Sequence, residues 1–256
     1  MISAVVITLN EERNIARCLA SLRGVADEVV VVDSGSTDRT EALCREAGAR
    51  FVRHEWQGYS EQKNYANSLA SHPWLLSLDA DEALSPRLRE SLLALKREGL
   101  RPHTAYTFNR LPNYCGRWIR HCGWYPDTSL RLWPNGEARW EGEVHEGLRF
   151  SSAVQRVHLK GDLEHYSYYT VGEHARQTVK FALLAGEQAY NRGRRCHALT
   201  VGFKPVATFL HDYLLRLGFL DGYTGYTICR MSAFYTFVKY ARLRELTLSS
   251  ALPDRP

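Results

Sequence analysis

The chain has 256 residues, of which 45% are hydrophobic and 24% charged, and its formal net charge is +5. This length suits one large domain, or one domain with a helical extension, and the composition excludes a polytopic membrane protein. No run of about 18 uncharged apolar residues predicts a spanning helix. Glu11 and Glu12 follow the first apolar run too early for a signal peptide, so we expect a cytosolic protein.

Basic residues are unevenly distributed along the chain. Residues 1–159 contain 20 Lys and Arg against 20 Asp and Glu, whereas residues 160–256 contain 13 against 8. The second part therefore carries the whole positive charge. Such a segment suits an anionic surface such as membrane lipid, or it is a solvated helical face.

Strands and helices alternate over the first hundred residues. Apolar runs predict buried strands at 3–9, 28–33, 49–56 and 74–81. Helices are expected between them, and Ser85-Pro86 opens another as a cap followed by a first-turn proline. The first helix has an apolar stripe made of Ile15, Cys18, Leu19 and Leu22. This order predicts an α/β fold with a mainly parallel sheet and helices on both faces.

The second half changes character. Short strand-like pieces at 105–110, 129–133, 144–150 and 153–159 predict a mixed or antiparallel continuation of the sheet. Helices are expected at 168–192, opened by a Thr170-x-x-Glu173 capping box, at 205–217 and at 226–246. We therefore expect two parts, a sheet domain at 1–160 and a C-terminal amphipathic helical extension at 161–256.

Polar clusters follow three of the predicted strands, at Thr8–Glu11, Asp33–Ser36 and Asp79–Asp81. In parallel sheets ligands bind beyond the carboxyl ends of the strands, so these clusters should face one crevice. Asp79 and Asp81 repel each other unless a cation offsets their charge. Mg²⁺ and Mn²⁺ prefer oxygen ligands and are held by one or two carboxylates with substrate phosphates, which predicts a divalent metal here.

Three more side chains near this crevice are candidate ligands, each with a structural alternative. Asp33 can accept from a base N–H or a ribose hydroxyl, while the residues after it can form only a turn and helix cap. Glu11 can reach a ribose or base, or can stabilise a helix dipole. Lys63 can pair with a diphosphate, or can be a solvated helix lysine.

The order of motifs T-L-N-E-E, V-V-D-S-x-S-T-D, Q-K-N and L-D-A-D-E resembles that of the family 2 glycosyltransferases with the GT-A fold. The resemblance covers about residues 1–100 and depends on several motifs in the right order. It implies a nucleotide-sugar donor. The implied nucleoside or diphosphate contacts are Thr8, Asn10, Glu11, Asp33 and Lys63. Asp79 and Asp81 match the D-x-D motif that holds the donor through a metal.

The second half resembles the lipopolysaccharide core β-1,4-glucosyltransferase group. The resemblance rests on Tyr125-Pro126-Asp127 before L-R-L, on Val144-His145-Glu146 and on G-F-L-D-G. It implies UDP-glucose as donor, a heptose of the lipid A–linked inner core as acceptor, and work at the cytoplasmic face of the inner membrane. Those enzymes are similar in length to this chain.

The family also implies inversion at the anomeric carbon by direct displacement, which needs a general base for the acceptor hydroxyl. Many members carry Glu-Asp where this chain has Pro126-Asp127. We assign the base to Asp127, with Glu143 and Glu146 as rivals. His145 is a third metal ligand, a diphosphate contact or an ordinary strand histidine. Arg131 steadies the diphosphate or Asp127, or forms a structural ion pair.

Other readings of the sequence remain open. A polyprenyl-phosphate glycosyltransferase would share the donor residues and differ in acceptor. A catalytically silent, membrane-bound module would not need three sets of repelling acids. Nucleic acid is not an expected partner, because the crevice is acidic and the basic residues lie elsewhere. Basic residues among aromatic and aliphatic ones in the tail predict peripheral membrane contact, with homo-oligomer packing as the rival. These basic residues are Lys204, Arg216, Arg230, Lys239, Arg242 and Arg244.

Overall fold

The computed structural model of the protein describes residues 1–142 and 147–249, which form two compact units. The first contains Met1–Leu111 and Pro126–Tyr166, and the second contains Pro112–Tyr125 and the chain from Ser167. The division differs from the expected boundary at 160/161. The reason is that one strand, β11 (Gln155–Tyr168), continues through Lys160-Gly161 without a break.

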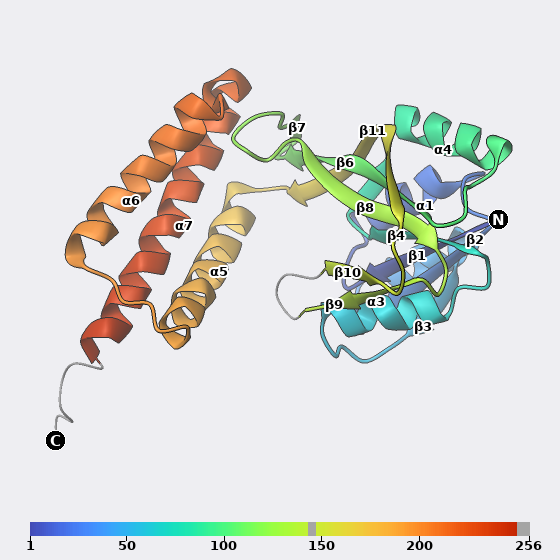
Figure 1. The fold of residues 1–256 in the computed structure, drawn as a ribbon, viewed down its shortest axis with the longest axis horizontal. Helices are drawn as coiled ribbons and strands as arrows, with labels where there is room; N and C mark the ends of the chain where they lie inside the picture. The colour runs from blue at the N-terminus through green and yellow to red at the C-terminus, as the bar shows by residue number, and fades with distance from the viewer. Residues whose placement is uncertain (143–146, 250–256) are drawn as a thin grey trace. The chain divides into compact units, whose positions relative to one another are not determined.

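The first unit alternates strands and helices in the predicted order (Figure 1). Its first half consists of β1 (Ile2–Thr8), α1 (Ile15–Leu22), β2 (Glu28–Asp33), α2 (Thr40–Glu46), β3 (Arg50–Arg53), α3 (Tyr59–Ser68), β4 (Trp74–Asp79), β5 (Glu82–Leu84) and α4 (Pro86–Glu98). The strands that follow in the chain are β6 (Thr104–Tyr114), β7 (Arg117–Trp118), β8 (Asp127–Pro134), β9 (Ala138–Glu141), β10 (Gly147–Phe150) and β11. Of these, β7 and the last residues of β6 and β11 belong to the second unit.

The strand order of the main sheet is β3-β2-β1-β4-β8-β6-β11-β5. β1 lies parallel to β2 and β4, and β2 lies parallel to β3. β8 then runs antiparallel to both β4 and β6. The expected α/β class, with a parallel core and an antiparallel continuation, is confirmed.

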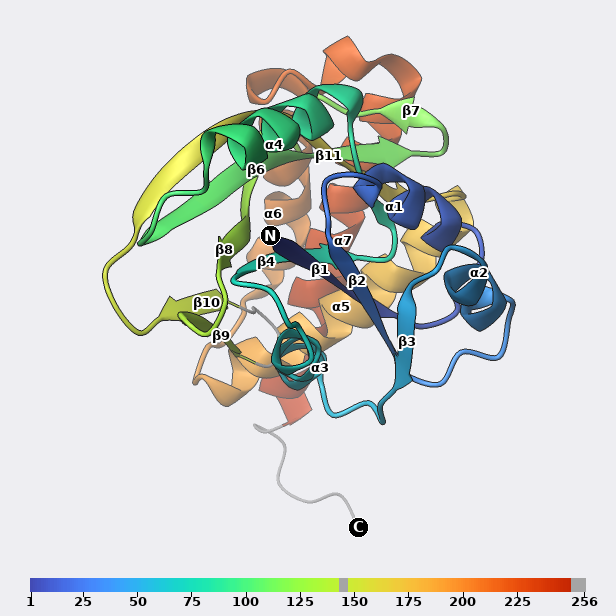
Figure 2. The same ribbon diagram turned by 90° about the vertical axis from the view of Figure 1, so that its right-hand side faces the viewer.

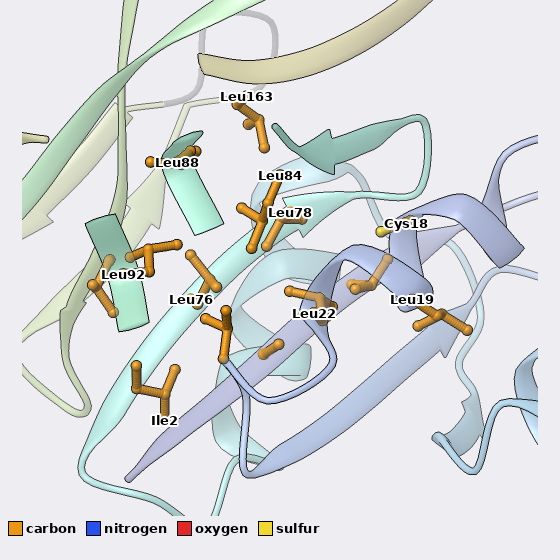
Figure 3. Packing of buried hydrophobic residues seen from close by; sticks show 14 of the residues in the cluster. Ile2, Cys18, Leu19, Leu22, Leu76, Leu78, Leu84, Leu88, Leu92 and Leu163 are labelled. Atoms are coloured by element: carbon orange, nitrogen blue, oxygen red, sulfur yellow. The ribbon is translucent and has the colours of Figure 1, made fainter. Parts of the chain in front are cut away.

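Helices cover both faces of this sheet (Figure 2). Successive side chains of a strand point to opposite faces, so Ala4 and Val6 join one core and Val5 and Ile7 the other. The first core is closed by α1, α2 and α4, and the second by α3. Figure 3 shows the first core, in which the predicted α1 stripe packs among leucines of β4 and α4. All four residues of that stripe are buried, as predicted.

The start of α4 lies against β11, and a glycine permits this contact. Ser85 caps the helix as expected, because its hydroxyl accepts from the backbone N–H of Leu88 at 3.3 Å. Gly161 has a φ of +103°, and a Cβ there would lie 2.3 Å from the Leu88 nitrogen. Any other residue at 161 would push α4 from the strand.

The second unit is mainly helical. α5 (Val171–Asn191) opens with the predicted Thr170–Glu173 capping box. It is followed by α6 (Ala198–Leu210), a π-helical turn at His211–Leu215, a 3₁₀ turn at Gly218–Asp221 and α7 (Gly222–Ser249). α7 packs along both α5 and α6 (Figure 1). Among the helices that the structure describes, none combines the length and apolar character that a bilayer crossing requires.

One helix of this unit differs from the prediction. The segment expected at 205–217 begins at Ala198 and ends as α-helix at Leu210. Pro205, the first residue of the expected segment, lies inside α6. No residue of α6 is buried in the structure. A pattern of core-facing apolar residues therefore does not mark where this helix begins.

Two leucines on α7 test how packing stabilises the second unit. Leu243 is 2% exposed and packs with Ala189 and Cys196, whereas Leu248 is 48% exposed. Leu243→Ala leaves a cavity and should lower the free energy of unfolding by about 2–5 kcal/mol. Leu248→Ala should change it by less than about 0.5 kcal/mol. Urea unfolding followed by circular dichroism measures both, and equal losses would contradict this packing.

Candidate active site

The carboxyl ends of β1, β2 and β4 meet at one edge of the sheet. Thr8 at the end of β1 is paired with Asp33 at the end of β2, and Ile7 is paired with Asp79 at the end of β4. The predicted meeting of the three polar clusters is therefore confirmed. Thr8 contributes a buried hydroxyl that has no hydrogen-bond partner among the described residues.

Side chains hold the loops after β1 and β2 together. Asn10 accepts from the backbone N–H of Thr37 at 2.8 Å, and its own N–H donates to the Ser36 hydroxyl at 2.7 Å. The N–H of Glu11 donates to the Thr40 hydroxyl at 2.8 Å. Asn10 has a φ of +54°, a left-handed conformation that asparagine tolerates better than most residues. The T-L-N-E-E motif thus fixes the shape of this rim of the crevice.

Asp33 stabilises the turn that the sequence offered as the structural alternative to ligand binding. Its side chain is fully buried, and one oxygen accepts from the backbone N–H groups of Gly35 at 2.9 Å and Ser36 at 2.8 Å. The other oxygen accepts from the Ser36 hydroxyl. These bonds hold the carboxylate at the strand end. The role of Asp33 as a nucleoside contact stays a prediction.

The Q-K-N motif on α3 joins three segments. Gln62 bonds to the ring of His54 at 2.9 Å and donates to the Ser34 hydroxyl at 3.0 Å. Asn64 donates to the carbonyl of Trp140 at 3.0 Å and accepts from its N–H at 2.9 Å. Between them, Lys63 is 7% exposed and is therefore not the solvated helix lysine that was its alternative.

Lys63 and Arg131 both pair with Asp79. The Lys63 Nζ lies 3.4 Å from Oδ1 of Asp79 and 4.7 Å from the centre of the Trp140 ring. Arg131 Nη2 donates to Oδ2 of Asp79 at 3.1 Å. Burial opposes ionisation of Asp79, but the two cations outweigh it and hold the pKa of Asp79 well below its usual range. Asp79 is therefore ionised and already neutralised by protein cations.

Glu82 is a buried carboxylate of the L-D-A-D-E motif, and the sequence predicted no role for it. Its Oε1 accepts from Arg131 Nη2 at 2.6 Å, and its Oε2 accepts from the backbone N–H of Asp79 at 2.9 Å. Burial raises the pKa of Glu82, while the charge of Arg131 opposes this. Arg131 thus forms the structural ion pair that was one of its predicted alternatives, and it does so with the D-x-D segment.

Asp81 lies beside a histidine that the sequence did not indicate. His165 comes from β11, where it is paired with Glu82, and its Nε2 lies 3.1 Å from Oδ2 of Asp81. Burial lowers the pKa of His165. The hydrogen bond to Asp81 and the negative charge of Asp81 outweigh this effect, so that the pKa of His165 is raised. No local pattern signals His165, because it follows Asp81 by 84 residues.

The side chains of Asp81 and His165 are of the chemical types that bind a divalent cation. A carboxylate oxygen and an imidazole nitrogen are both accepted by Mn²⁺, and one or two protein ligands with substrate phosphates are typical of Mg²⁺ sites. Within residues 1–142 and 147–249, no group of three or more His, Cys, Asp or Glu side chains is placed to hold a metal. The protein pair would therefore need oxygen ligands from a bound diphosphate.

Asp127, the predicted base, lies at the start of β8 and pairs with Arg110 of β6. The Nε and Nη2 atoms of Arg110 lie 2.8 and 2.7 Å from Oδ2 of Asp127. The ion pair to Asp127 therefore comes from Arg110, which was not among the predicted residues, whereas Arg131 contacts Asp79 and Glu82. The rivals Glu143 and Glu146, together with His145, lie outside the described residues.

A cavity of about 540 Å³ lies beside these pairs. Its lining includes Lys63, Asp79, Arg110 and Arg131, with the indole of Trp140 as an apolar wall. Trp140 and Trp133 are themselves core residues that form an edge-to-face pair with 5.9 Å between ring centres. The cavity thus combines charged side chains of the D-x-D network with an aromatic surface.

Comparison with known proteins gives a consistent family. Residues 3–112 match the profile described as glycosyl transferase family 2. The chain is 32% identical to the lipopolysaccharide core biosynthesis glycosyltransferase LpsC of Rhizobium meliloti (strain 1021), over 99% of this chain and 95% of that protein. It is 28% identical to an uncharacterized glycosyltransferase of Rickettsia typhi, over 97% of this chain and 88% of that protein.

Solved structures with partial similarity include glucosyl-3-phosphoglycerate synthase of Mycobacterium tuberculosis in complex with Mn²⁺, UDP and glucosyl-3-phosphoglycerate. The alignment covers 44% of each chain at 25% identity, with a TM-score of 0.37. The same enzyme in complex with Mg²⁺ and UDP gives the same values.

The titration of Glu11 reports chiefly on its burial beside the crevice. Burial, with the charges of Asp81 and Asp38, raises the pKa of Glu11 to about 7, although its bond to Asn14 opposes this. The folded protein therefore keeps a proton that the unfolded chain loses near pH 4.5. In EDTA, stability should fall as the pH rises from about 4.5 to about 7, and Glu11→Gln should remove that fall.

Thermal unfolding at several pH values measures this difference. Glu12→Gln is the matched control, since Glu12 is the exposed neighbour on the same loop. If the difference between wild type and Glu11→Gln stays constant with pH, the proposed environment of Glu11 is wrong.

Proposed function

The chain belongs to glycosyl transferase family 2, and from this premise we propose that it transfers a hexose, glucose from UDP-glucose, to a heptose of the lipopolysaccharide inner core. The full-length similarity to LpsC supports the lipopolysaccharide acceptor. The observation that carries the proposal is the Asp81–His165 pair beside the neutralised Asp79, at the edge where β1, β2 and β4 end. The choice of glucose and heptose rests on the motif resemblance.

We assign donor binding to the edge formed by β1 and β2. Thr8 and Asp33 lie side by side at the strand ends, and Asn10 and Glu11 form the adjoining loop. The Thr8 hydroxyl at this edge is buried and has no hydrogen-bond partner among the described residues, and such an unpaired group supports a nucleoside contact here. Lys63 lies on the diphosphate side, where its charge is shared with Asp79.

Asp81 and His165 would hold the divalent metal, Mg²⁺ or Mn²⁺, together with the donor diphosphate. When bound, the metal offsets the negative charge that develops on the departing UDP. Arg131 and Lys63 keep Asp79 ionised and in place next to this pair. These ion pairs are formed before the donor binds, and such preorganisation is the condition for effective electrostatic stabilisation.

Asp127 is the base in this proposal. It removes the proton from the acceptor hydroxyl while that oxygen forms a bond to the anomeric carbon. The bond between the anomeric carbon and the diphosphate oxygen breaks, and its electron pair leaves with UDP. A single displacement of this kind inverts the anomeric configuration and forms no covalent enzyme intermediate.

Donor binding provides the direct test. Wild-type protein is titrated calorimetrically with UDP-glucose, UDP-galactose and GDP-mannose, in Mn²⁺ or in EDTA. We expect binding of UDP-glucose that requires metal and weakens at least about tenfold in Asp81→Ala, because a metal ligand is lost. Asp127→Asn should bind the donor like wild type and lose about 10²–10⁴-fold in transfer rate to lipid A–core acceptors.

Two outcomes would overturn this function. Failure of every nucleotide to bind folded wild-type protein would leave the catalytically silent module. Transfer to polyprenyl phosphate, with no transfer to core saccharides, would establish the alternative acceptor class.

We also propose that the protein is peripheral at the cytoplasmic face of the inner membrane and binds it through α6. Four large apolar residues, Leu199, Phe203, Val206 and Leu210, recur along α6 at helical spacing, and all are exposed. Leu199 and Phe203 are 86% and 70% exposed. Exposed apolar stripes of this size mark interaction surfaces.

The charges near this α6 stripe favour an anionic lipid surface over a second copy of the chain. Lys204 and Arg216 are both exposed, and Asp212 is the one acidic residue within 198–220. Asp212 is half-buried beside His211. Two copies joined by this surface would bring like charges together, whereas anionic headgroups would neutralise them. Arg242, by contrast, pairs with Glu187 and Glu245 and is already neutralised.

Vesicle sedimentation tests the membrane contact. Wild type should bind vesicles containing phosphatidylglycerol more strongly than phosphatidylcholine alone. The double variant Leu199→Glu/Phe203→Glu should bind at least about tenfold less, because two buried apolar side chains contribute about 3 kcal/mol or more. Leu184→Glu, at an exposed leucine of α5, is the matched control. Vesicle binding that the double variant retains, or a concentration-dependent dimer that it disrupts, would reject the proposal.

A further inference from the structure

Arg110 holds Asp127 through one of its two carboxylate oxygens. Arg110 Nε and Nη2 both point to Oδ2, at 2.8 and 2.7 Å. Neither of these two contacts is made by the second oxygen, Oδ1. The guanidinium thus fixes one oxygen and does not occupy the other.

Arg110 is itself anchored from the interior. Its Nη1 lies 3.7 Å from Oε1 of Glu82, the carboxylate whose side chain is 0% exposed. Glu82 in turn accepts from Arg131 at 2.6 Å and from the backbone N–H of Asp79 at 2.9 Å. Arg110 therefore has a fixed counter-charge behind it as well as Asp127 in front of it.

The contact between Arg110 and Glu82 decides whether Arg110 and Asp127 can keep one relative orientation. The two side chains are 32% and 43% exposed, and an isolated pair at such exposure gains little over the entropy of ordering two side chains. Contact with the buried Glu82 limits the conformations of Arg110 before Asp127 binds. The guanidinium fork also fixes the direction of both hydrogen bonds, which an ammonium group cannot do.

Alternating charges connect the predicted base with the donor site. The order of contacts is Asp127, Arg110, Glu82, Arg131, Asp79 and Lys63, all within the first unit. Each anion lies between cations or against one, so no member of this ion-pair chain is a lone buried charge.

We propose that Arg110 is a positioning residue for the transfer reaction, which orients Asp127 so that Oδ1 faces the acceptor hydroxyl. The inference rests on the proposed function, in which Asp127 is the base. Oδ1 takes the hydroxyl proton as the oxygen bonds to the anomeric carbon, and Arg110 stays protonated and bound to Oδ2 throughout. Arg110 takes no part in the proton transfer itself, so it acts on the rate through orientation.

The test compares Arg110→Ala, Arg110→Lys and the control Arg97→Ala, which changes an exposed arginine of α4. Arg110→Ala should lower kcat about 10–100-fold, with the donor Kd and the unfolding midpoint close to those of wild type. Arg110→Lys keeps the charge but loses the fork, so it should recover only part of the loss. Guanidinium added to Arg110→Ala should restore activity, whereas methylammonium at the same concentration should not.

Other outcomes overturn the inference. An unchanged kcat in Arg110→Ala, or a loss that guanidinium does not restore, would show that Arg110 does not position the base. Should Arg110→Ala not fold, Arg110→Lys with the kcat of wild type would have the same meaning. Failure of the proposed function is separate from this: wild type would then bind no nucleotide sugar, or Asp127→Asn would transfer at the rate of wild type.

Discussion

Glu82 places a negative charge inside the sheet domain, where water cannot solvate it. An isolated buried carboxylate is costly, and it persists here because Arg131 donates to one oxygen and the backbone of Asp79 donates to the other. The same arginine also reaches Asp79, so one buried cation neutralises two acids of neighbouring segments. The positions of Asp79 and Arg110 both depend on this arrangement, because each contacts Glu82 or its partner.

The two aspartates of the D-x-D segment accordingly lie in different environments. Asp79 is ionised but neutralised by protein cations, whereas Asp81 faces His165 near the surface. Repulsion between the two acids is thereby reduced without a metal. What remains at Asp81 is a carboxylate and an imidazole, which suit a cation that arrives with its phosphate ligands. On the β1 side, burial is the first cause of the raised pKa of Glu11, and the nearby charges of Asp81 and Asp38 add to it.

The helical unit is stabilised by a different set of forces. α7 is packed between neighbours along its length, while α6 contributes no buried residue and leaves its apolar stripe exposed. This arrangement explains why the basic residues of the tail do not act alike. Arg242 near the end of α7 is neutralised by Glu187 and Glu245, whereas Lys204 on α6 and Arg216 after it stay exposed.

Local signals in the sequence were enough for the strands β1, β2 and β4, the α1 stripe and the caps of α4 and α5, because each depends on periodicity or on a few adjacent residues. The parallel order then brought Thr8, Asp33 and Asp79 to one edge. The partners of those residues were decided by the tertiary structure. Glu82, Arg110 and His165 come from β5, β6 and β11, and only the antiparallel closure of the sheet brings them together. Such pairings depend on strand register over many tens of residues, which no local pattern of amino acids encodes.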